Sequence, residues 1–382
     1  MRKLIIAIPT IFLLIGAGCF RTPHGAARIL PSRQLPSKEQ SAFPLTNHSE
    51  LVLITTSTEA APITEGTALV TSTAAIETVI SKAPSGKPPQ FIAISFDGSK
   101  SLEMWQNVLD LSHELGAQGT PLHYSFFLSG VYMLDPEHKT EYSPPGFPVG
   151  SSRIGFADSA SDVARRIQYM NQALVEGNDI GSHLNGHYDG LKWTAAEWQS
   201  EFDQFVRFTT NPKLHLTQDQ IIGFRAPNLS VNKDLWPVLK AHGYTYDASL
   251  VGKFGEWPHK VHGDFWEFPL VSIQLAGTNK KLLSMDYNFY YAQTGAHDMV
   301  KKTDPEWQVY KEQVLNSYRN YFAQSYSGNR APVIIGHHFA HWNDGVYWAA
   351  LHDFLKETCG KPEVHCVSFK ELASYLDVHP HK

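Results

Sequence analysis

Cysteine is scarce in this chain of 382 residues, which contains only Cys19, Cys359 and Cys366. No pair of them has the Cys-x-x-Cys spacing of a zinc ribbon, which excludes that class of metal-binding module. An odd number of cysteines also leaves one without an intramolecular partner in an exported chain. The segment from Cys359 to Cys366 is short and contains Gly and Pro, so either a disulfide or two buried thiols fits the sequence.

Positive charge is also limited. The 32 Lys and Arg residues are outnumbered by 37 Asp and Glu residues, which gives a net charge of -5 and a pI of about 6.4. Nucleic-acid-binding proteins normally present a basic surface, so we expect no nucleic-acid partner. With 42% hydrophobic and 18% charged residues, the composition is that of a globular protein with a large core.

The amino terminus has the layout of an export signal. Arg2 and Lys3 precede the apolar run Leu4–Ile15, which is too short for a comfortable membrane span, and small residues then lead to Cys19. This pattern resembles a bacterial lipoprotein signal, in which Cys19 would carry the lipid. A plain cleaved signal or an uncleaved anchor is the alternative. We expect residues 1–19 to be a signal peptide and the protein to be exported to the periplasm or cell envelope, with the membrane contacted only through this lipid.

Two regions follow the signal. Residues 20–88 are rich in Ser, Thr, Ala and Pro without helical or strand periodicity, which predicts a flexible tether. Residues 89–382 alternate between strand-like and helix-like patterns, and such alternation predicts a parallel sheet, either open or closed into a barrel. The expected strands are 91–99, 122–130, 179–183, 221–227, 244–249, 265–270, 332–339 and 364–369, and the expected helices are 101–116, 162–178, 194–210, 232–243, 304–326, 346–359 and 370–376.

Ionisable residues stand at the carboxyl ends of four expected strands, namely Asp97, His183, Arg225 and His337. In a β/α barrel these ends converge on the face that carries the active site. His183 is followed by His187, and although 19 histidines make one such pair expected by chance, the position at a strand end favours a metal site.

The chemistry of these groups points to metal-assisted hydrolysis of an amide or ester. Two imidazoles can hold Zn²⁺, and a carboxylate such as Asp97 could complete the ligand set or act as a general base. His337 or His338 could protonate a leaving group. Backbone N–H groups near Pro227 could stabilise an oxyanion.

Five short motifs in one order resemble those of the polysaccharide deacetylases, the NodB-homology group or carbohydrate esterase family four. They are "SFDGS", "SHLNGH", "FRAPN", "DFWEFPL" and "VIIGHH", and the resemblance runs from about Phe91 to Leu376. It implies a distorted (β/α)7-type barrel and a bound Zn²⁺, or another divalent metal such as Co²⁺.

The resemblance also implies roles for individual residues. Asp97 would be the general base, and His183 and His187 would bind the metal. Arg225 would orient the base through an acidic partner, for which Asp264 is the candidate.

On the substrate side, the resemblance implies that His337 is the general acid, with His338 as the less favoured choice. The backbone N–H of Asn228, beside Pro227, would be the oxyanion donor. Trp266 would line the pocket for the acetyl methyl group.

One departure from the family pattern affects the metal site. Gly98 stands where the family has a second Asp, its third metal ligand. Either Asp97 binds the metal and another group is the base, or the metal has two protein ligands and extra water, or metal binding is weak. Leu184 also replaces a Ser or Thr that supports the loop, and Asn185 could substitute for it.

These residues predict removal of N-acetyl groups from an N-acetylglucosamine-containing polysaccharide, with release of acetate. Peptidoglycan is the favoured substrate because the export signal indicates the bacterial envelope. A chitin-like polymer is the alternative. An O-acetyl esterase would use the same site. A degenerate deacetylase fold that only binds glycans is the reading favoured by Gly98.

Overall fold

The computed structural model describes residues 86–380. The predicted signal peptide (1–19), with Cys19, and nearly all of the predicted tether (20–88) lie outside these residues. No helix within the described part is long and apolar enough to cross a membrane.

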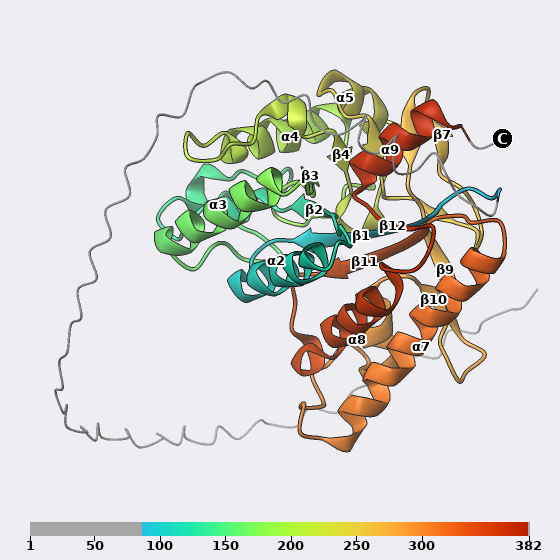
Figure 1. The fold of residues 1–382 in the computed structure, drawn as a ribbon. Helices are drawn as coiled ribbons and strands as arrows, with labels where there is room; N and C mark the ends of the chain where they lie inside the picture. Colours follow the sequence, from blue (N-terminus) through green and yellow to red (C-terminus); the bar gives the residue numbers. More distant parts are fainter. Residues whose placement is uncertain (1–85, 381–382) are drawn as a thin grey trace, which may run out of the picture. The chain divides into compact units, whose positions relative to one another are not determined.

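A curled, mostly parallel sheet forms the centre of the described domain (Figure 1). Its strand order is β11-β1-β2-β3-β4-β5-β8-β7, and β12 pairs with the first half of β1. Only β7 runs antiparallel to its neighbour β8. The strands are β1 (Gln90–Gly98), β2 (Tyr124–Leu128), β3 (Asp179–Ser182), β4 (Gly223–Phe224), β5 (Tyr246–Asp247), β7 (His259–Val261), β8 (Phe265–Glu267), β11 (Val333–His338) and β12 (Val364–Cys366).

A second, small sheet has the order β10-β9-β6, and a parallel bridge between Met285 and Gly336 connects the segment after β10 to β11. Helices connect most of the parallel strands, so the expectation of a distorted β/α barrel is confirmed. The remaining elements are β6 (Val251–Gly252), β9 (Leu270–Gln274), β10 (Lys281–Leu283), α2 (Leu102–Ala117), α3 (Ala160–Val175), α4 (Ala195–Thr209), α5 (Leu235–Ala241), α6 (Asp286–Thr294), α7 (Pro305–Ser327), α8 (Trp342–Thr358) and α9 (Phe369–Val378).

Strand β1 is a buried, interior strand of the sheet. It lies between β11 and β2, and the side chains from Phe91 to Phe96 are almost completely excluded from solvent. A parallel strand that is covered on both faces reads as a continuous apolar run, which is why "FIAISF" identifies it in the sequence. Ser101 then starts α2 by accepting a hydrogen bond from the backbone N–H of Met104, as its position before an apolar-periodic segment predicts.

The sequence patterns assigned no element between residues 271 and 303, yet β10, most of β9 and α6 lie there. The α6 segment "DYNFYYAQT" is dominated by aromatic residues, which favour strands rather than helices. Its helical state is therefore set by tertiary contacts, and Gly295 ends it with φ +66°.

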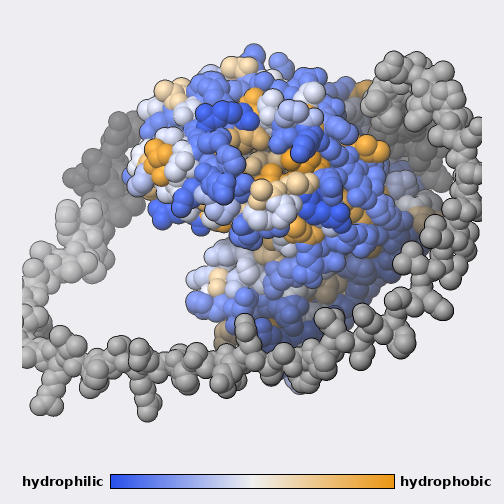
Figure 2. Space-filling view, turned by 90° about the vertical axis from the view of Figure 1, so that its left-hand side faces the viewer, coloured by the Kyte–Doolittle hydropathy of each residue, from blue (hydrophilic) through white to orange (hydrophobic). Residues whose placement is uncertain are grey.

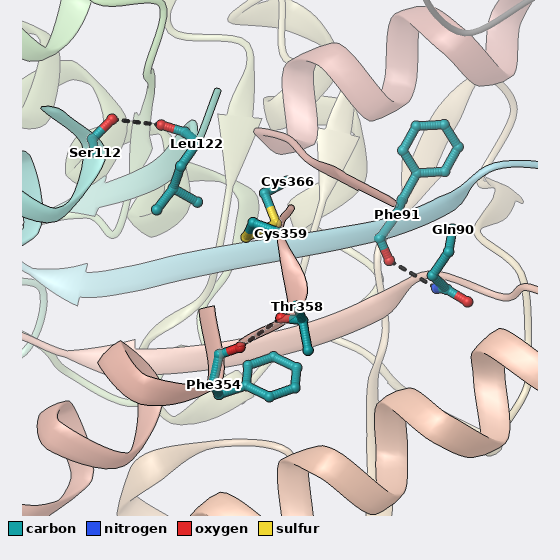
Figure 3. The surroundings of a disulfide bond; sticks show 8 residues. All are labelled: Gln90, Phe91, Ser112, Leu122, Phe354, Thr358, Cys359 and Cys366. Atoms are coloured by element: carbon teal, nitrogen blue, oxygen red, sulfur yellow. Dashed lines mark hydrogen bonds between the residues drawn. A yellow bond between two sulfur atoms is a disulfide. The ribbon is translucent and has the colours of Figure 1, made fainter. Parts of the chain in front are cut away.

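Cys359 and Cys366 form a disulfide, so the alternative of two buried thiols is wrong (Figure 3). Cys359 follows the last turn of α8, and Cys366 ends β12, which pairs with the start of β1. The bond therefore fixes the end of α8 to the central strands.

We expect Cys359→Ala/Cys366→Ala to lower the free energy of unfolding by about 2–3 kcal/mol, because the disulfide closes a short loop in the unfolded chain. Urea unfolding of the oxidised wild type and of the variant measures this. Reduced wild-type protein is the matched control and should unfold near the midpoint of the variant. Equal midpoints for oxidised and reduced wild type would contradict the stabilising role.

Candidate functional site

A cavity of about 170 Å³ opens at the carboxyl ends of β1, β3 and β11. Asp97, His183, His187 and His338 line it together. In Figure 1, β1 runs from right to left, so this end of the sheet lies on the side that Figure 2 shows, where hydrophobic side chains interrupt a hydrophilic surface. The other lining residues are Gly98, Ser99, Lys100, Ser129, Tyr132, Ile154, Phe339, Ala340 and Trp342.

Arg225 holds the carboxylate of Asp97 at the floor of the cavity. Its Nη1 donates hydrogen bonds to Asp97 Oδ1 at 2.9 Å and to Ser95 Oγ at 2.8 Å, and its Nε donates to the carbonyl of Ala248 at 2.9 Å. Burial alone would raise the pKa of Asp97, but the charges of Arg225 and the nearby histidines lower it below its usual range. Asp97 is therefore an ionised carboxylate in a buried position.

His183 presents one free ring nitrogen to the cavity. Its Nδ1 lies 2.8 Å from the carbonyl oxygen of Arg225, which can only accept, so Nδ1 carries the proton and Nε2 is the lone-pair nitrogen. Nε2 is buried and has no hydrogen-bond partner among residues 86–380. Burial lowers the pKa of His183 to about 4, so the imidazole is neutral at pH 7.

His187 faces the same space, with its ring centroid 5.1 Å from that of His183. Burial, followed by the charge of His338, lowers the pKa of His187 as well. Metal binding requires neutral imidazoles, and this pair is held in that state. The orphaned nitrogen of His183 and the adjacent carboxylate of Asp97 make a nitrogen–oxygen donor set of the kind that Zn²⁺ accepts.

The donor set is nevertheless incomplete. Gly98 directly follows Asp97 with φ +101°, a conformation that side-chain-bearing residues rarely adopt. Within the described residues, no group of three or more His, Cys, Asp or Glu side chains is arranged to hold a metal ion. The histidine pair therefore lacks a preformed third protein ligand.

His338, rather than His337, faces the cavity. In the pairing of β11 with β1, His338 lies opposite Asp97 and His337 lies opposite Phe96. Successive side chains of a strand point to opposite faces, so only one of the two can share the face of Asp97. His337, the favoured general acid of the family resemblance, does not line the cavity: it is 1% exposed, and its Nε2 lies 3.0 Å from the hydroxyl of Tyr318.

Asp286, at the start of α6, holds His338. One carboxylate oxygen lies 2.6 Å from His338 Nδ1, and the other accepts the backbone N–H of His338 at 2.8 Å. Burial would lower the pKa of His338, but the charge and hydrogen bond of Asp286 raise it above its usual value. Asp286 was not among the residues expected from the sequence, because no helical pattern marked α6.

Besides Arg225 and His337, four other expected site residues do not line the cavity. Asp264 is exposed between β7 and β8, so it is not the partner of Arg225, which binds Asp97 directly. Trp266 packs in the core, and its Nε1 donates to Asp377 at 2.9 Å. Pro227 and Asn228 form a turn after β4, outside the lining of the cavity.

Trp342 supplies the aromatic wall that Trp266 was expected to provide. Its ring stacks on Tyr290 with centroids 4.9 Å apart and lies 5.1 Å from the ring of His338. Trp342 begins α8, directly after the segment that follows β11. A tryptophan a few residues beyond "VIIGHH" was the available sequence signal.

A buried hydrogen-bond network supports the loop after β3 that carries His183 and His187, called the histidine loop below. The side-chain amide of Asn185 donates to the backbone carbonyl of Glu201 at 2.8 Å and to its carboxylate at 3.0 Å. Tyr142 donates to the same carboxylate at 2.9 Å and accepts the backbone N–H of Gly186 at 3.1 Å. Asn185 thus provides the polar support expected of it, and burial raises the pKa of Glu201 to about 7.

Comparison with known proteins gives a match in structure only. No protein-family model matches the sequence, and no curated protein matches it. A Mycobacterium smegmatis protein assigned as a polysaccharide deacetylase is 14% identical, with a TM-score of 0.50 and alignment of 79% of this chain and 94% of that one. A probable polysaccharide deacetylase of Pseudomonas aeruginosa PAO1 is 11% identical, with a TM-score of 0.48 and coverage of 78% and 97%.

A chitin deacetylase of the fungal pathogen Colletotrichum lindemuthianum is 15% identical, with a TM-score of 0.42 and coverage of 74% and 87%. At these identities the likeness concerns the fold alone. The chain has the β/α-barrel fold seen in the Mycobacterium smegmatis protein, and the resemblance drawn from the five motifs is confirmed at that level.

We expect Glu201 to make the stability of the domain depend on pH. Its pKa is raised from 4.5 to about 7, so the folded state binds more protons and stability falls as pH rises between these values, by roughly 3 kcal/mol. Urea unfolding from pH 5 to 8 should show a smaller fall for Glu201→Gln than for the wild type. Asp203→Asn, an exposed site on the same helix, is the control. The same slope for Glu201→Gln and the wild type would refute this role.

Proposed function

We propose that this protein is a metal-dependent hydrolase that removes N-acetyl groups from an N-acetylglucosamine-containing polysaccharide. The main support for this proposal is that one cavity contains an ionised Asp97, the neutral His183 and His187, and a His338 whose pKa is raised. Titratable groups with pKa values driven apart by their surroundings are typical of acid–base catalysis. The deacetylase fold agrees with this assignment.

Asp97 is the proposed general base. Arg225 occupies Oδ1, which leaves Oδ2 to take a proton from the attacking water. A carboxylate whose pKa is low is a weak base, so Asp97 needs a water that is already acidified. A metal held by the neighbouring histidine pair would meet this requirement, because it would acidify the attacking water.

His183 and His187 are the proposed metal ligands. A divalent cation here, with Zn²⁺ favoured by two imidazole nitrogens and Co²⁺ as an alternative, would polarise the acetyl carbonyl and acidify the water. With Gly98 beside Asp97, the remaining positions would be filled by water, substrate or Asp97 itself. The hydrogen bond from His183 to the Arg225 carbonyl orients the ligand nitrogen.

His338 takes the role of general acid that the family resemblance implied for His337. Asp286 holds Nδ1, so the proton on Nε2 is the one delivered to the departing amine nitrogen as the C–N bond breaks. The products are acetate and a free amine on the sugar. Trp342, beside His338, offers an apolar surface for the substrate.

Peptidoglycan is the proposed polymer, and a chitin-like polymer is the alternative. The lipoprotein-like signal with Cys19 supports an exported protein anchored in the cell envelope. The Cys359–Cys366 disulfide also supports export, since disulfides persist in oxidising compartments.

A second candidate function is glycan binding without catalysis. The specific observation in its favour is Gly98, together with the lack of a three-residue ligand set among residues 86–380. Against it, a binding protein has no need for a paired acid and base in one cavity.

We expect chelator-sensitive acetate release from N-acetylglucosamine oligomers and from peptidoglycan. His183→Ala should lose both the bound metal and the acetate release, because it removes a ligand nitrogen. Elemental analysis and an acetate assay measure the two properties. Full acetate release by His183→Ala would refute the metal assignment, and tight glycan binding without turnover by the wild type would favour the binding protein. Release from O-acetylated substrates alone would indicate an esterase.

The adjacent histidines of β11 offer a matched pair of variants. His338→Gln should reduce kcat by about 10²–10⁴-fold, because it removes the proton donor to the leaving group. His337→Gln should reduce kcat far less, since the side chain points away from the cavity. Steady-state acetate release, with circular dichroism as the folding control, makes the comparison. A larger loss of kcat for His337→Gln would reverse the assignment.

A further inference from the structure

The segment 134–159 presents an exposed aromatic ring beside the cavity. Phe147 is 41% exposed, and one face of its ring stacks on Tyr188 with centroids 4.1 Å apart. Tyr188 is buried and directly follows His187. One face of the Phe147 ring therefore packs on Tyr188, which directly follows the proposed metal ligand His187, and the rest of the ring is open to solvent.

The loop that carries Phe147 is fixed to the histidine loop by several bonds. The hydroxyls of Ser151 and Tyr188 lie 2.8 Å apart, and the backbone N–H of Arg153 donates to the carbonyl of Gly186 at 2.9 Å. Tyr142, at the base of the loop, is fully buried and accepts the N–H of Gly150 at its carbonyl at 2.8 Å. A ring on such a supported loop loses little conformational entropy when it binds a ligand.

Arg153 adds a cation to the same place. Its guanidinium carbon lies 5.3 Å from the ring centroid of Phe147 and 5.5 Å from that of Tyr188. The side chain is exposed, and no carboxylate of residues 86–380 lies within ion-pair distance of it. Its N–H donors are available to hydroxyl or carbonyl oxygens of a ligand.

Phe147 also lines one side of a surface groove of about 740 Å³. The opposite wall is the first turns of α4, and the remaining lining is mostly proline, serine and glycine of the loop. Phe147 and Arg153 lie close to the cavity, because Ile154 and His187 line it and are the chain neighbours of Arg153 and of Tyr188, which contacts Phe147. Both loops follow the carboxyl ends of β2 and β3, on the side of the sheet that carries the cavity.

We propose that Phe147 and Arg153 form a binding site for a further sugar ring of the same polysaccharide chain whose acetylated unit enters the cavity. A pyranose has an apolar face of C–H groups that can stack on an aromatic ring, and hydroxyls on its edge that can accept from a guanidinium. The groove is open to solvent and is lined by consecutive residues of the loop from Ser143 to Pro148. This inference rests on the proposed function, which it extends to a substrate of several linked sugars.

The test compares chain-length dependence in the full-length protein. Phe147→Ala should lower kcat/KM for penta-N-acetylchitopentaose about tenfold relative to kcat/KM for a small acetyl ester such as 4-nitrophenyl acetate, because only the oligomer reaches Phe147. The loss should appear in KM, and Phe147→Tyr should restore it. Arg153→Gln should lower the same ratio to a smaller degree.

Phe254→Ala is the matched control. Phe254 is 42% exposed, and the neighbouring Gly255 accepts a hydrogen bond from Asn329, which precedes β11 and so lies at the opposite end of that strand from the cavity. Its ratio of oligomer to ester activity should equal that of the wild type. An equal ratio for Phe147→Ala and the wild type would overturn the proposed sugar site while leaving the deacetylase proposal intact.

Calorimetry with the same pentasaccharide separates the two proposals if the wild type shows no turnover. Weaker binding by Phe147→Ala than by Phe254→Ala would then support the sugar site although the hydrolase proposal had failed. Identical affinities of the two variants would overturn the sugar site as well.

Discussion

The buried contact between Arg225 and Asp97 is the constraint on which the rest of the site depends. Arg225 is 0% exposed and fixes the carboxylate through Nη1, while its own carbonyl fixes the tautomer of His183. Arg225, which directly follows β4, therefore sets both the charge of the proposed base and the free nitrogen of the proposed ligand. Taking either charge out of a buried pair leaves the other unpaired, which typically costs about 3–5 kcal/mol.

The contacts of Asp286 favour a positive charge on His338, in contrast to the negative charge of Asp97. Asp286 holds His338 by two hydrogen bonds and favours its protonated form, while His183 and His187 are kept neutral mainly by burial. The pKa values of the three histidines are thus shifted in different directions, because only His338 has a carboxylate partner at hydrogen-bond distance. That division of roles is what makes the cavity suited to acid–base chemistry.

The histidine loop depends on elements that lie far from it in the sequence. Asn185 and Gly186 are bound by Glu201 of α4 and by Tyr142 of the segment 134–159. The same segment supports Phe147 above Tyr188. The segment 134–159 thus both stabilises the loop that carries His183 and His187 and extends the surface beside the cavity.

The sequence by itself determined the alternating architecture and the placement of Asp97, His183 and Arg225 at strand ends, because buried parallel strands leave continuous apolar runs that end in polar residues. It did not determine the sheet face of each β11 histidine, since a one-residue shift in register exchanges His337 and His338. It also missed Asp286, because the aromatic α6 has no helical pattern, and it misplaced Asp264 and Trp266, which belong to the motif "DFWEFPL" but do not line the cavity. Only the tertiary structure decided these, since register, strand face and long-range pairing arise from contacts between segments that are distant in the chain.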